Sequence, residues 1–200
     1  MLILARHGNT FEAHERAVWV GARTDLPLTA EGLAQAERAA GYLVAHSRVP
    51  ERVVAGPLQR TRAFAAVIAG RFGLRPEIDE RLKELDYGAW EGLDAAEVVV
   101  RFGQADLSAW EEGLIWPADA RWSEGKSAVE QRVGAVLDDL RAAAQGGIIL
   151  AVTSNGVLRF VRLMVSGDRA SRATKVRTGA LCLLRPADRG WAVDGWDIRP

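Results

Sequence analysis

The pattern of apolar and polar positions predicts a chain in which short buried strands alternate with helices. Short apolar segments predict strands at 2–5, 52–55, 148–153, 180–184 and 191–193, with an edge strand at 76–78. Apolar residues spaced three or four apart predict helices at 33–43, 64–72, 129–140 and 157–165. This alternation favours parallel βαβ units. We therefore expect an α/β fold, a three-layer sandwich whose mostly parallel sheet carries helices on both faces.

Local signals mark where two of the helices begin. Thr29 offers its side-chain oxygen as an N-cap to the helix that follows it. Asp94 and Glu97 have the spacing of a capping box, which predicts a further short helix. Residues 11–27 and 81–90 show no sustained period, so we expect both segments to be loops.

One stretch departs from the alternation of strands and helices. Residues 104–125 carry Trp110, Trp116 and Trp122 among Pro, Gly and acidic residues. We interpret this stretch as an insertion packed over a sheet edge, within a single domain that spans residues 1–200. Our hypothesis is that it covers a pocket and contacts substrate. The alternative is that the rings fill core, which aromatic residues do more often than they bind ligands.

Composition and charge narrow the classes of function. The 26 basic residues balance 26 acidic ones, so net charge favours neither nucleic acid nor an anionic membrane as a partner. The single cysteine, Cys182, rules out an internal disulfide, and no apolar run is long enough to span a bilayer or form a signal-peptide core. We expect a cytoplasmic protein. With three histidines and one cysteine, no multi-ligand zinc pattern can be assembled, although carboxylate-bound magnesium stays open.

Candidate chemistry lies at the ends of three predicted strands. Arg6 and His7 follow the first strand, Arg60 lies near the start of the helix after the second, and Asn155 follows the strand at 148–153. If these strands are parallel neighbours, their carboxyl ends share one edge, where open α/β sheets bind ligands. The N-termini of the following helices would point N–H groups at the same place. Two arginines, amides and an imidazole suit a phosphoryl group, since guanidinium binds phosphate oxygens in pairs.

Short motifs along the chain strengthen this interpretation. They are Arg6-His7-Gly8-Asn9-Thr10, Pro27-Leu28-Thr29-Ala30-Glu31-Gly32, Pro57-Leu58-Gln59-Arg60-Thr61, Glu84-Leu85-Asp86-Tyr87-Gly88 with Trp90-Glu91-Gly92, and Ser154-Asn155-Gly156-Val157-Leu158-Arg159. Together they resemble the histidine phosphatase superfamily, in its phosphoglycerate-mutase-like branch. One such motif is weak evidence, but five in the family's order, covering nearly the whole chain, are strong.

The resemblance implies a two-step phosphoryl transfer that needs no metal and no cofactor. It assigns the nucleophile to His7, which becomes phosphohistidine, and the acid that protonates the leaving oxygen to Glu84. The residues that it places on the phosphate are Arg6, Arg60, Asn9 and Asn155. Elementary chemistry agrees with these roles. A neutral imidazole can attack phosphorus, fixed cations offset the charge on the oxygens, and an alcohol leaves more readily with a proton.

The proposed acid needs an unusual environment. Glu84 must hold a proton, and its neighbours Leu85, Tyr87 and Trp90 would raise its pKa by desolvation. Without the surrounding motif, a solvated loop carboxylate is the simpler interpretation of Glu84.

Asn155 departs from the family pattern. Members usually carry a second histidine in this turn, a cation that binds phosphate, whereas asparagine donates a hydrogen bond without charge. The difference between a charged and a neutral hydrogen bond predicts a loss of about tenfold to a hundredfold in rate. We hypothesise that Lys126 restores some of this charge, and an exposed lysine near a helix start is the simpler alternative.

We therefore expect a metal-independent phosphatase that hydrolyses a small phosphate monoester through a phosphohistidine at His7. One alternative is a phosphoglycerate-type mutase, which returns the phosphoryl group to its substrate. The other is a catalytically weakened or inactive member of the family that binds a phosphorylated ligand or a protein. Asn155 supports this alternative, and the presence of His7 and Glu84 argues against it. The expected partner is a small phosphorylated metabolite, with neither nucleic acid nor membrane, and the chain is expected to be a monomer or a homodimer.

Overall fold

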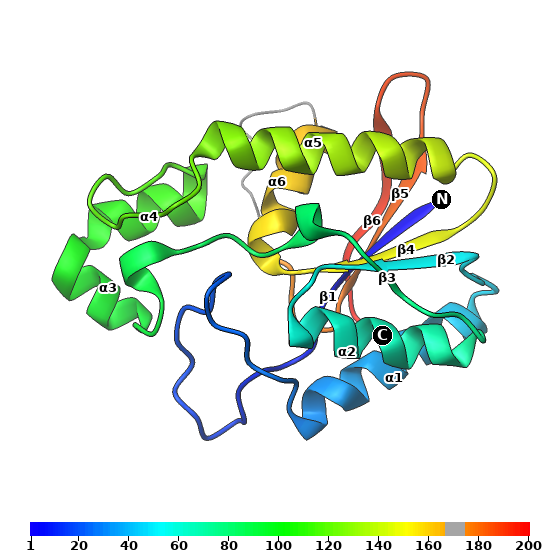
Figure 1. The fold of residues 1–200 in the computed structure, drawn as a ribbon, viewed down its shortest axis with the longest axis horizontal. Helices are drawn as coiled ribbons and strands as arrows, with labels where there is room; N and C mark the ends of the chain where they lie inside the picture. Colours follow the sequence, from blue (N-terminus) through cyan, green and yellow to red (C-terminus); the bar gives the residue numbers. More distant parts are fainter. Residues whose placement is uncertain (167–174) are drawn as a thin grey trace.

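The computed structural model describes residues 1–166 and 175–200, and its centre is a six-stranded sheet (Figure 1). The strand order is β3 (Glu77–Ile78), β2 (Arg52–Ala55), β4 (Ile149–Thr153), β1 (Leu2–Arg6), β5 (Leu181–Pro186) and β6 (Trp191–Ile198). The first four of these strands pair in parallel, and β5 and β6 pair antiparallel at one side. The prediction of an α/β fold with a mostly parallel sheet is confirmed.

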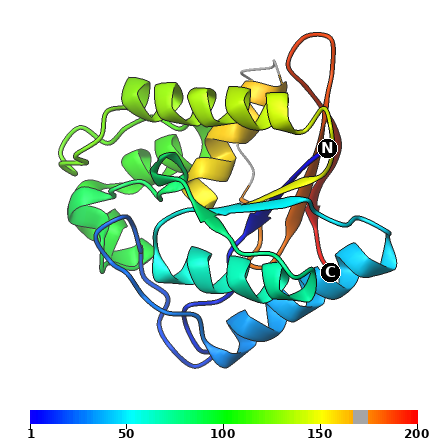
Figure 2. The same ribbon diagram turned by 45° about the vertical axis from the view of Figure 1, so that its right-hand side comes forward.

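Helices cover both faces of the sheet. α1 (Ala30–Ala45) and α2 (Gln59–Arg71) lie on one face, and α5 (Lys126–Ala143) and α6 (Asn155–Ser166) lie on the other (Figure 2). This arrangement gives the three layers that the alternation of strands and helices predicts.

The apolar run of β1 explains why two helical layers are needed. Leu2 and Leu4 contribute to the core beneath α5 and α6, whereas Ile3 and Ala5 contribute to the core beneath α1 and α2. All four side chains are at most 1% exposed. Successive side chains of a strand point to opposite faces, so a strand that is apolar at every position is stable only between two covering layers.

The loop at 11–27 joins β1 to α1 and, as predicted, contains no regular helix or strand. Its exit is fixed by Thr29, whose hydroxyl accepts a hydrogen bond from the Gly32 N–H at 3.1 Å as the predicted N-cap. Its entry is fixed by Gly8, where a β carbon would lie 2.7 Å from the Gly32 Cα. The close approach of these two glycines packs the residues after β1 against the start of α1.

Two further helices lie outside the layers, beyond the carboxyl ends of the parallel strands (Figure 1). In α3 (Ala95–Phe102) the predicted capping box is present: Asp94 accepts from the Glu97 N–H at 2.8 Å, and the Glu97 carboxylate accepts from the Asp94 N–H at 3.0 Å. α4 (Gln104–Gly113) lies within the stretch that we interpret from the sequence as an insertion, and this helix was not predicted. Its apolar period is short, and Gly103, at a φ of 94°, turns the chain from α3 into α4.

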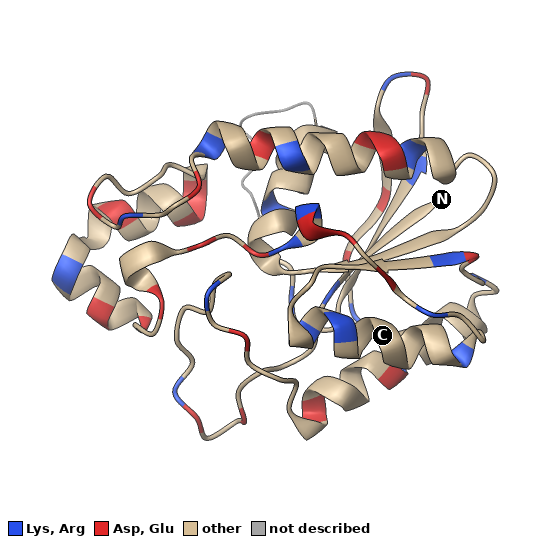
Figure 3. Cartoon of the chain, viewed as in Figure 1, with Lys and Arg blue, Asp and Glu red and all other residues tan. Residues whose placement is uncertain are grey.

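The segment between β3 and α3 is the predicted loop, with two short 3₁₀ turns in it, η1 (Glu80–Leu82) and η2 (Gly88–Trp90). Charged residues of both signs are interspersed over the helices and loops, and the central strands carry few of them (Figure 3). Among the described residues, none of the helices has the length and apolar character needed to cross a membrane.

Candidate active site

A cavity of about 790 Å³ opens at the carboxyl ends of β1, β2 and β4. These strands are parallel neighbours, so the residues that follow them meet at one edge of the sheet, as the sequence predicts. The predicted site residues that line the cavity are Arg6, His7, Asn9, Arg60, Glu84 and Asn155.

His7 is buried, and its geometry fixes one tautomer of the ring. Its backbone N–H donates to the Thr153 carbonyl at 3.1 Å, and its Nδ1 lies 2.8 Å from the Gly8 carbonyl oxygen. A carbonyl can only accept, so Nδ1 carries the proton and Nε2 keeps the lone pair. Burial, and after it the charges of Arg6 and Arg60, hold the pKa of His7 well below its ordinary value of 6.5. The ring is therefore neutral and suited to nucleophilic attack.

Two arginines flank the imidazole. Arg60 is 1% exposed and donates to the carbonyls of Thr24 and Gly21 at 2.9 and 3.1 Å. Arg6 is partly buried and donates from Nη1 to the Val176 carbonyl at 2.6 Å, while its Nε is buried without a partner in the described part of the chain. Burial lowers the pKa of both guanidinium groups. Neither forms an ion pair with a described residue, so an anionic ligand would complete this part of the site.

Glu84 lies between η1 and η2 and is 6% exposed. Its Oε1 accepts from the Leu85 N–H at 2.9 Å, and its Oε2 accepts from the Gly156 N–H at 3.2 Å. Burial raises the pKa of Glu84 above its ordinary 4.5, although these N–H groups and Arg60 oppose the shift. A carboxyl that retains its proton in a cavity can donate that proton to the leaving oxygen of a bound ligand.

Position 156, at the start of α6, requires a glycine. A β carbon there would lie 2.5 Å from the Tyr87 hydroxyl and closer still to Oε1 of Glu84. Tyr87 lines the cavity, and burial, with the Glu84 charge, raises its pKa well above 10, so its hydroxyl stays protonated. Gly156 thus lets the candidate acid and this hydroxyl approach the backbone of α6.

The segment before the candidate acid is held from two sides. Thr153, at the end of β4, donates its hydroxyl to the Leu82 carbonyl at 2.7 Å. Arg132 of α5 donates from Nη1 to the carbonyls of Arg81 and Lys83 at 2.7 and 2.9 Å. This role of Arg132 could not be predicted, because in the sequence it resembles an ordinary arginine on an exposed helix face.

Both asparagines of the predicted site are held through their side-chain carbonyls. Oδ1 of Asn155 accepts from the Val176 N–H at 3.0 Å. Oδ1 of Asn9 accepts from the Thr178 hydroxyl at 2.5 Å and from Gln35 Nε2 at 3.2 Å. The polar group that each amide retains for a ligand is its NH₂.

The helix N-termini differ from the expectation. We expected their N–H groups to point at a ligand, but the Gln59 N–H of α2 donates to Asp25 at 2.7 Å, and the Gly156 N–H of α6 donates to Glu84. The positive end of a helix attracts carboxylates, and here both carboxylates come from the protein.

Other basic residues considered from the sequence lie elsewhere. Arg16 pairs with Asp94 at 2.8 Å, and Arg23 pairs with Asp86 at 3.0 Å. Lys126 is the first residue of α5. None of the three basic residues lines the cavity, so the hypothesis that Lys126 restores charge to it gains no support.

The tryptophans of residues 104–125 divide between the two interpretations. Trp110 of α4 lines the cavity together with Glu111. Trp116 and Trp122 do not line it, and they pack edge-on against Trp110 with ring centroids 5.3 and 4.7 Å away. One ring therefore forms part of the cavity wall, and the others form the core that supports it.

Among the cations that line the cavity, Arg159 and Lys175 were not predicted as site residues. Arg159 is 4% exposed, donates to the carbonyls of Trp110 (2.9 Å) and Glu111, and lies over the Trp110 ring at 4.8 Å, so it fastens α4 to α6. It follows Asn155 by four residues, and this spacing could have placed it on the same helix face. Lys175 also lines the cavity, and no pattern in the sequence singles it out.

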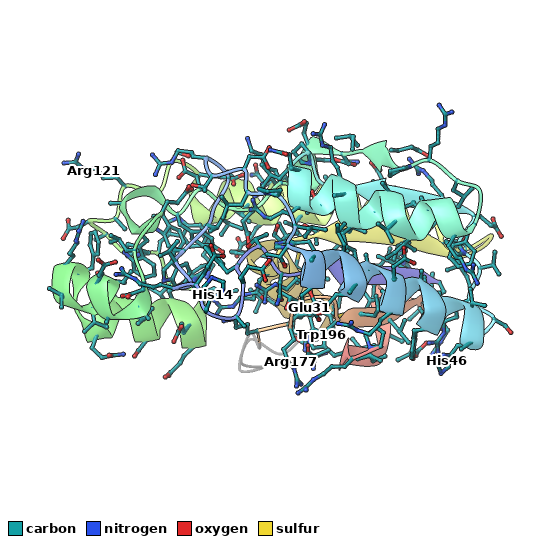
Figure 4. All side chains as sticks on the ribbon, turned by 90° about the horizontal axis from the view of Figure 1, so that it is seen from below. His14, Glu31, His46, Arg121, Arg177 and Trp196 are labelled. Atoms are coloured by element: carbon teal, nitrogen blue, oxygen red, sulfur yellow. The ribbon has the colours of Figure 1, made fainter. Side chains whose placement is uncertain are left out.

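The remaining histidines do not reach the site. His46 caps the far end of α1, where its ring stacks on Tyr42 at 4.0 Å, and His14 lies on the 11–27 loop without lining the cavity (Figure 4). Within the described residues there is no group of three or more His, Cys, Asp or Glu placed to hold a metal ion.

Comparison with known proteins gives a family match. The family model described as the histidine phosphatase superfamily, branch 1, matches residues 2–199. The bifunctional protein Rv2228c of Mycobacterium tuberculosis is 33% identical over 152 residues, which are 76% of this chain and 40% of that protein. The chain therefore spans about two fifths of the length of that relative.

Two further comparisons extend over nearly the whole chain. The probable phosphoglycerate mutase GpmB of Escherichia coli is 29% identical over 204 residues, covering 98% of this chain and 89% of that protein. The solved structure of a mycobacterial glucosyl-3-phosphoglycerate phosphatase is similar with a TM-score of 0.83 and 23% identity, covering 100% of this chain and 99% of that one. The structural likeness shows a shared fold.

Proposed function

Because the chain belongs to the histidine phosphatase superfamily, branch 1, we propose that it is a phosphatase that hydrolyses a small phosphate monoester through a phosphohistidine at His7. One observation carries the proposal. A neutral imidazole, with its lone pair on Nε2, lies beside two guanidinium groups that have no ion-pair partner among the described residues. Phosphoryl transfer needs a nucleophile beside cations that can bind the phosphoryl oxygens.

In the first step, Arg6 and Arg60 bind the oxygens of the phosphoryl group and offset the charge that develops on them. Nε2 of His7 attacks phosphorus, the bond from phosphorus to the alcohol oxygen breaks, and Glu84 gives its proton to that oxygen. In the second step, the Glu84 carboxylate takes a proton from water as the water oxygen attacks phosphorus. The P–N bond breaks, inorganic phosphate leaves, and His7 returns to its neutral form.

In this proposal Asn155 stands in the place of the family's second histidine and contributes a neutral donor. Its Oδ1 is engaged by the Val176 N–H, which a protonated imidazole could not satisfy because it has no acceptor. The site would therefore have less positive charge at this position, and catalysis would be weaker but present.

A phosphoglycerate-type mutase is the second candidate, favoured by the similarity to a probable mutase over 98% of the chain. The two activities differ in the fate of the phosphoryl group. A mutase returns it to a hydroxyl of the substrate, so its product is an isomeric ester. A phosphatase gives it to water, so its product is inorganic phosphate.

The test is phosphate release from a panel of esters that includes p-nitrophenyl phosphate, measured with and without a chelator, together with calorimetry of ester binding. The matched variants are His7→Ala and His14→Ala, because His14 lies on the adjoining loop but does not line the cavity. We expect release by the wild type and by His14→Ala, and none by His7→Ala. Ligand binding without release from any ester would favour a binding protein, and loss of release with chelator would contradict a metal-independent mechanism.

A further inference from the structure

Lys175 and Thr178 line the cavity, and the segment 175–178 is tied to the site by hydrogen bonds. The Val176 N–H donates to Oδ1 of Asn155 at 3.0 Å, and the Val176 carbonyl accepts from Nη1 of Arg6 at 2.6 Å. The other end of the segment is held through Oδ1 of Asn9. Val176 itself is fully buried. The backbone beside Lys175 is therefore fixed against the phosphate-binding residues.

Lys175 differs from the other cations that line the cavity. Arg6, Arg60 and Arg159 each donate to backbone carbonyls, which fixes their guanidinium groups. The Lys175 side chain is exposed at the cavity, and its ammonium group makes no hydrogen bond or ion pair with a residue that the structure describes. It is a positive charge that remains available to a ligand.

Lys175 lines the cavity together with the charged residues Arg6, Glu111 and Arg159. Desolvation by the surrounding protein, followed by repulsion from Arg6, lowers the pKa of the Lys175 ammonium group, with Arg159 acting in the same direction and Glu111 opposing. Lys175 thus shares the cavity with Arg6, at the end of β1, and with Glu111 of α4. A cation among other cations is unfavourable until an anion reaches it.

Resting on the proposed phosphatase function, we propose that Lys175 binds a second anionic group, a carboxylate or a phosphate, on the alcohol part of the substrate. Arg6 and Arg60 already serve the reacting phosphoryl group. The alcohol part of the bound ester therefore extends away from this end into the rest of the cavity, which Lys175 lines. A lysine ammonium is a compact charge on a flexible stem with three donors, which suits an anion of either geometry.

The test uses three esters with the same carbon chain: propyl phosphate, 3-phosphonooxypropanoate and propane-1,3-diyl bisphosphate. They differ in whether the far end is neutral, a carboxylate or a phosphate. The ratio of kcat/KM between each anionic ester and propyl phosphate is measured for the wild type, Lys175→Gln, Lys175→Arg and the control Lys126→Gln. The same ratios of Kd are measured by calorimetry in a His7→Ala background, where no turnover occurs.

We expect the wild type to prefer at least one anionic ester, and the ester that it prefers identifies the carboxylate or the phosphate. Lys175→Gln should reduce that preference about tenfold, through KM rather than kcat. It should leave kcat/KM for propyl phosphate unchanged. Lys175→Arg and Lys126→Gln should retain the preference. Equal losses for all three esters, or no preference in the wild type, would overturn the proposal.

Failure of the phosphatase proposal is recognised separately. In that case propyl phosphate and the other esters release no phosphate in a His7-dependent manner, yet the Kd ratios in the His7→Ala background still support or overturn the assignment of Lys175.

Discussion

The two ends of the cavity differ in how firmly their polar groups are held. At the strand ends, His7, Arg60 and Glu84 are each at most 6% exposed, and each is fixed by hydrogen bonds to backbone groups. At the α4 end, Lys175 and Glu111 are exposed, and the wall is built by elements outside the sheet layers. Under the proposed function, the reacting groups belong to the folded core, whereas the groups that would meet the rest of the substrate belong to its periphery.

Among the variants that distinguish the two ends of the cavity, we expect the largest loss of activity from a change at Glu84, the proposed acid. Glu84→Gln should slow hydrolysis of propyl phosphate by about 10²–10⁴-fold, because the amide cannot protonate the leaving alcohol. The first step with p-nitrophenyl phosphate should be slowed much less, since nitrophenolate can leave without a proton. Single-turnover rates for both esters provide the comparison, and equal losses would contradict the role of Glu84 as an acid.

The pH profile of kcat/KM tests the proposed protonation states of His7 and Glu84. Activity requires neutral His7 and protonated Glu84, so it should rise as pH increases through the lowered pKa of His7 and fall as pH increases through the raised pKa of Glu84. Glu84→Gln should remove the alkaline fall and keep the acid rise. An alkaline fall that persists in Glu84→Gln would assign that limb to another group.

A smaller effect is expected from a single methyl group at the start of α6. In Gly156→Ala the added carbon displaces Glu84 or Tyr87, so turnover should fall and unfolding should become easier by about 1–3 kcal/mol. Gly134→Ala is the matched control, because a β carbon at Gly134 of α5 meets nothing within 4 Å. That control should be neutral or stabilise the helix by up to about 1 kcal/mol. Similar kinetics for both variants would show that Glu84 tolerates displacement.

The smallest catalytic effect is expected at the α4 end. Arg159→Met leaves the carbonyls of Trp110 and Glu111 without this donor, so α4 should loosen and stability should fall by about 1–3 kcal/mol. KM for larger esters should rise, while kcat for p-nitrophenyl phosphate should stay near that of the wild type. Thermal unfolding and steady-state kinetics measure the two effects, and a collapse of kcat would place Arg159 in the reacting part of the site.

The residues at the strand ends could be predicted from the sequence, and the reason is physical. Apolar runs such as residues 2–5 specify strands buried on two faces, and parallel neighbours bring Arg6, His7 and Asn155 to one edge without further information. The capping residues Thr29 and Asp94 likewise act locally, so their roles could be predicted from spacing alone.

The α4 end could not be predicted in the same way. The helical period of α4 is short, with Leu107 and Trp110 as its buried residues, so periodicity did not predict this helix. Lys175 reaches the cavity because Asn155 and Arg6 hold Val176, a contact between residues about 20 and 170 positions apart. Such long-range hydrogen bonds leave no periodic signal in the chain.

The central claim, that His7 carries the phosphoryl group, is tested most directly by trapping the intermediate. The protein is mixed with p-nitrophenyl phosphate, quenched within one turnover in alkaline denaturant, and digested for mass spectrometry. We predict one phosphoryl group on the peptide that contains His7, with more of it accumulating in Glu84→Gln because the base for the second step is lost. Steady release of phosphate with no phosphoryl group on His7, or with the group on another residue, would contradict the account.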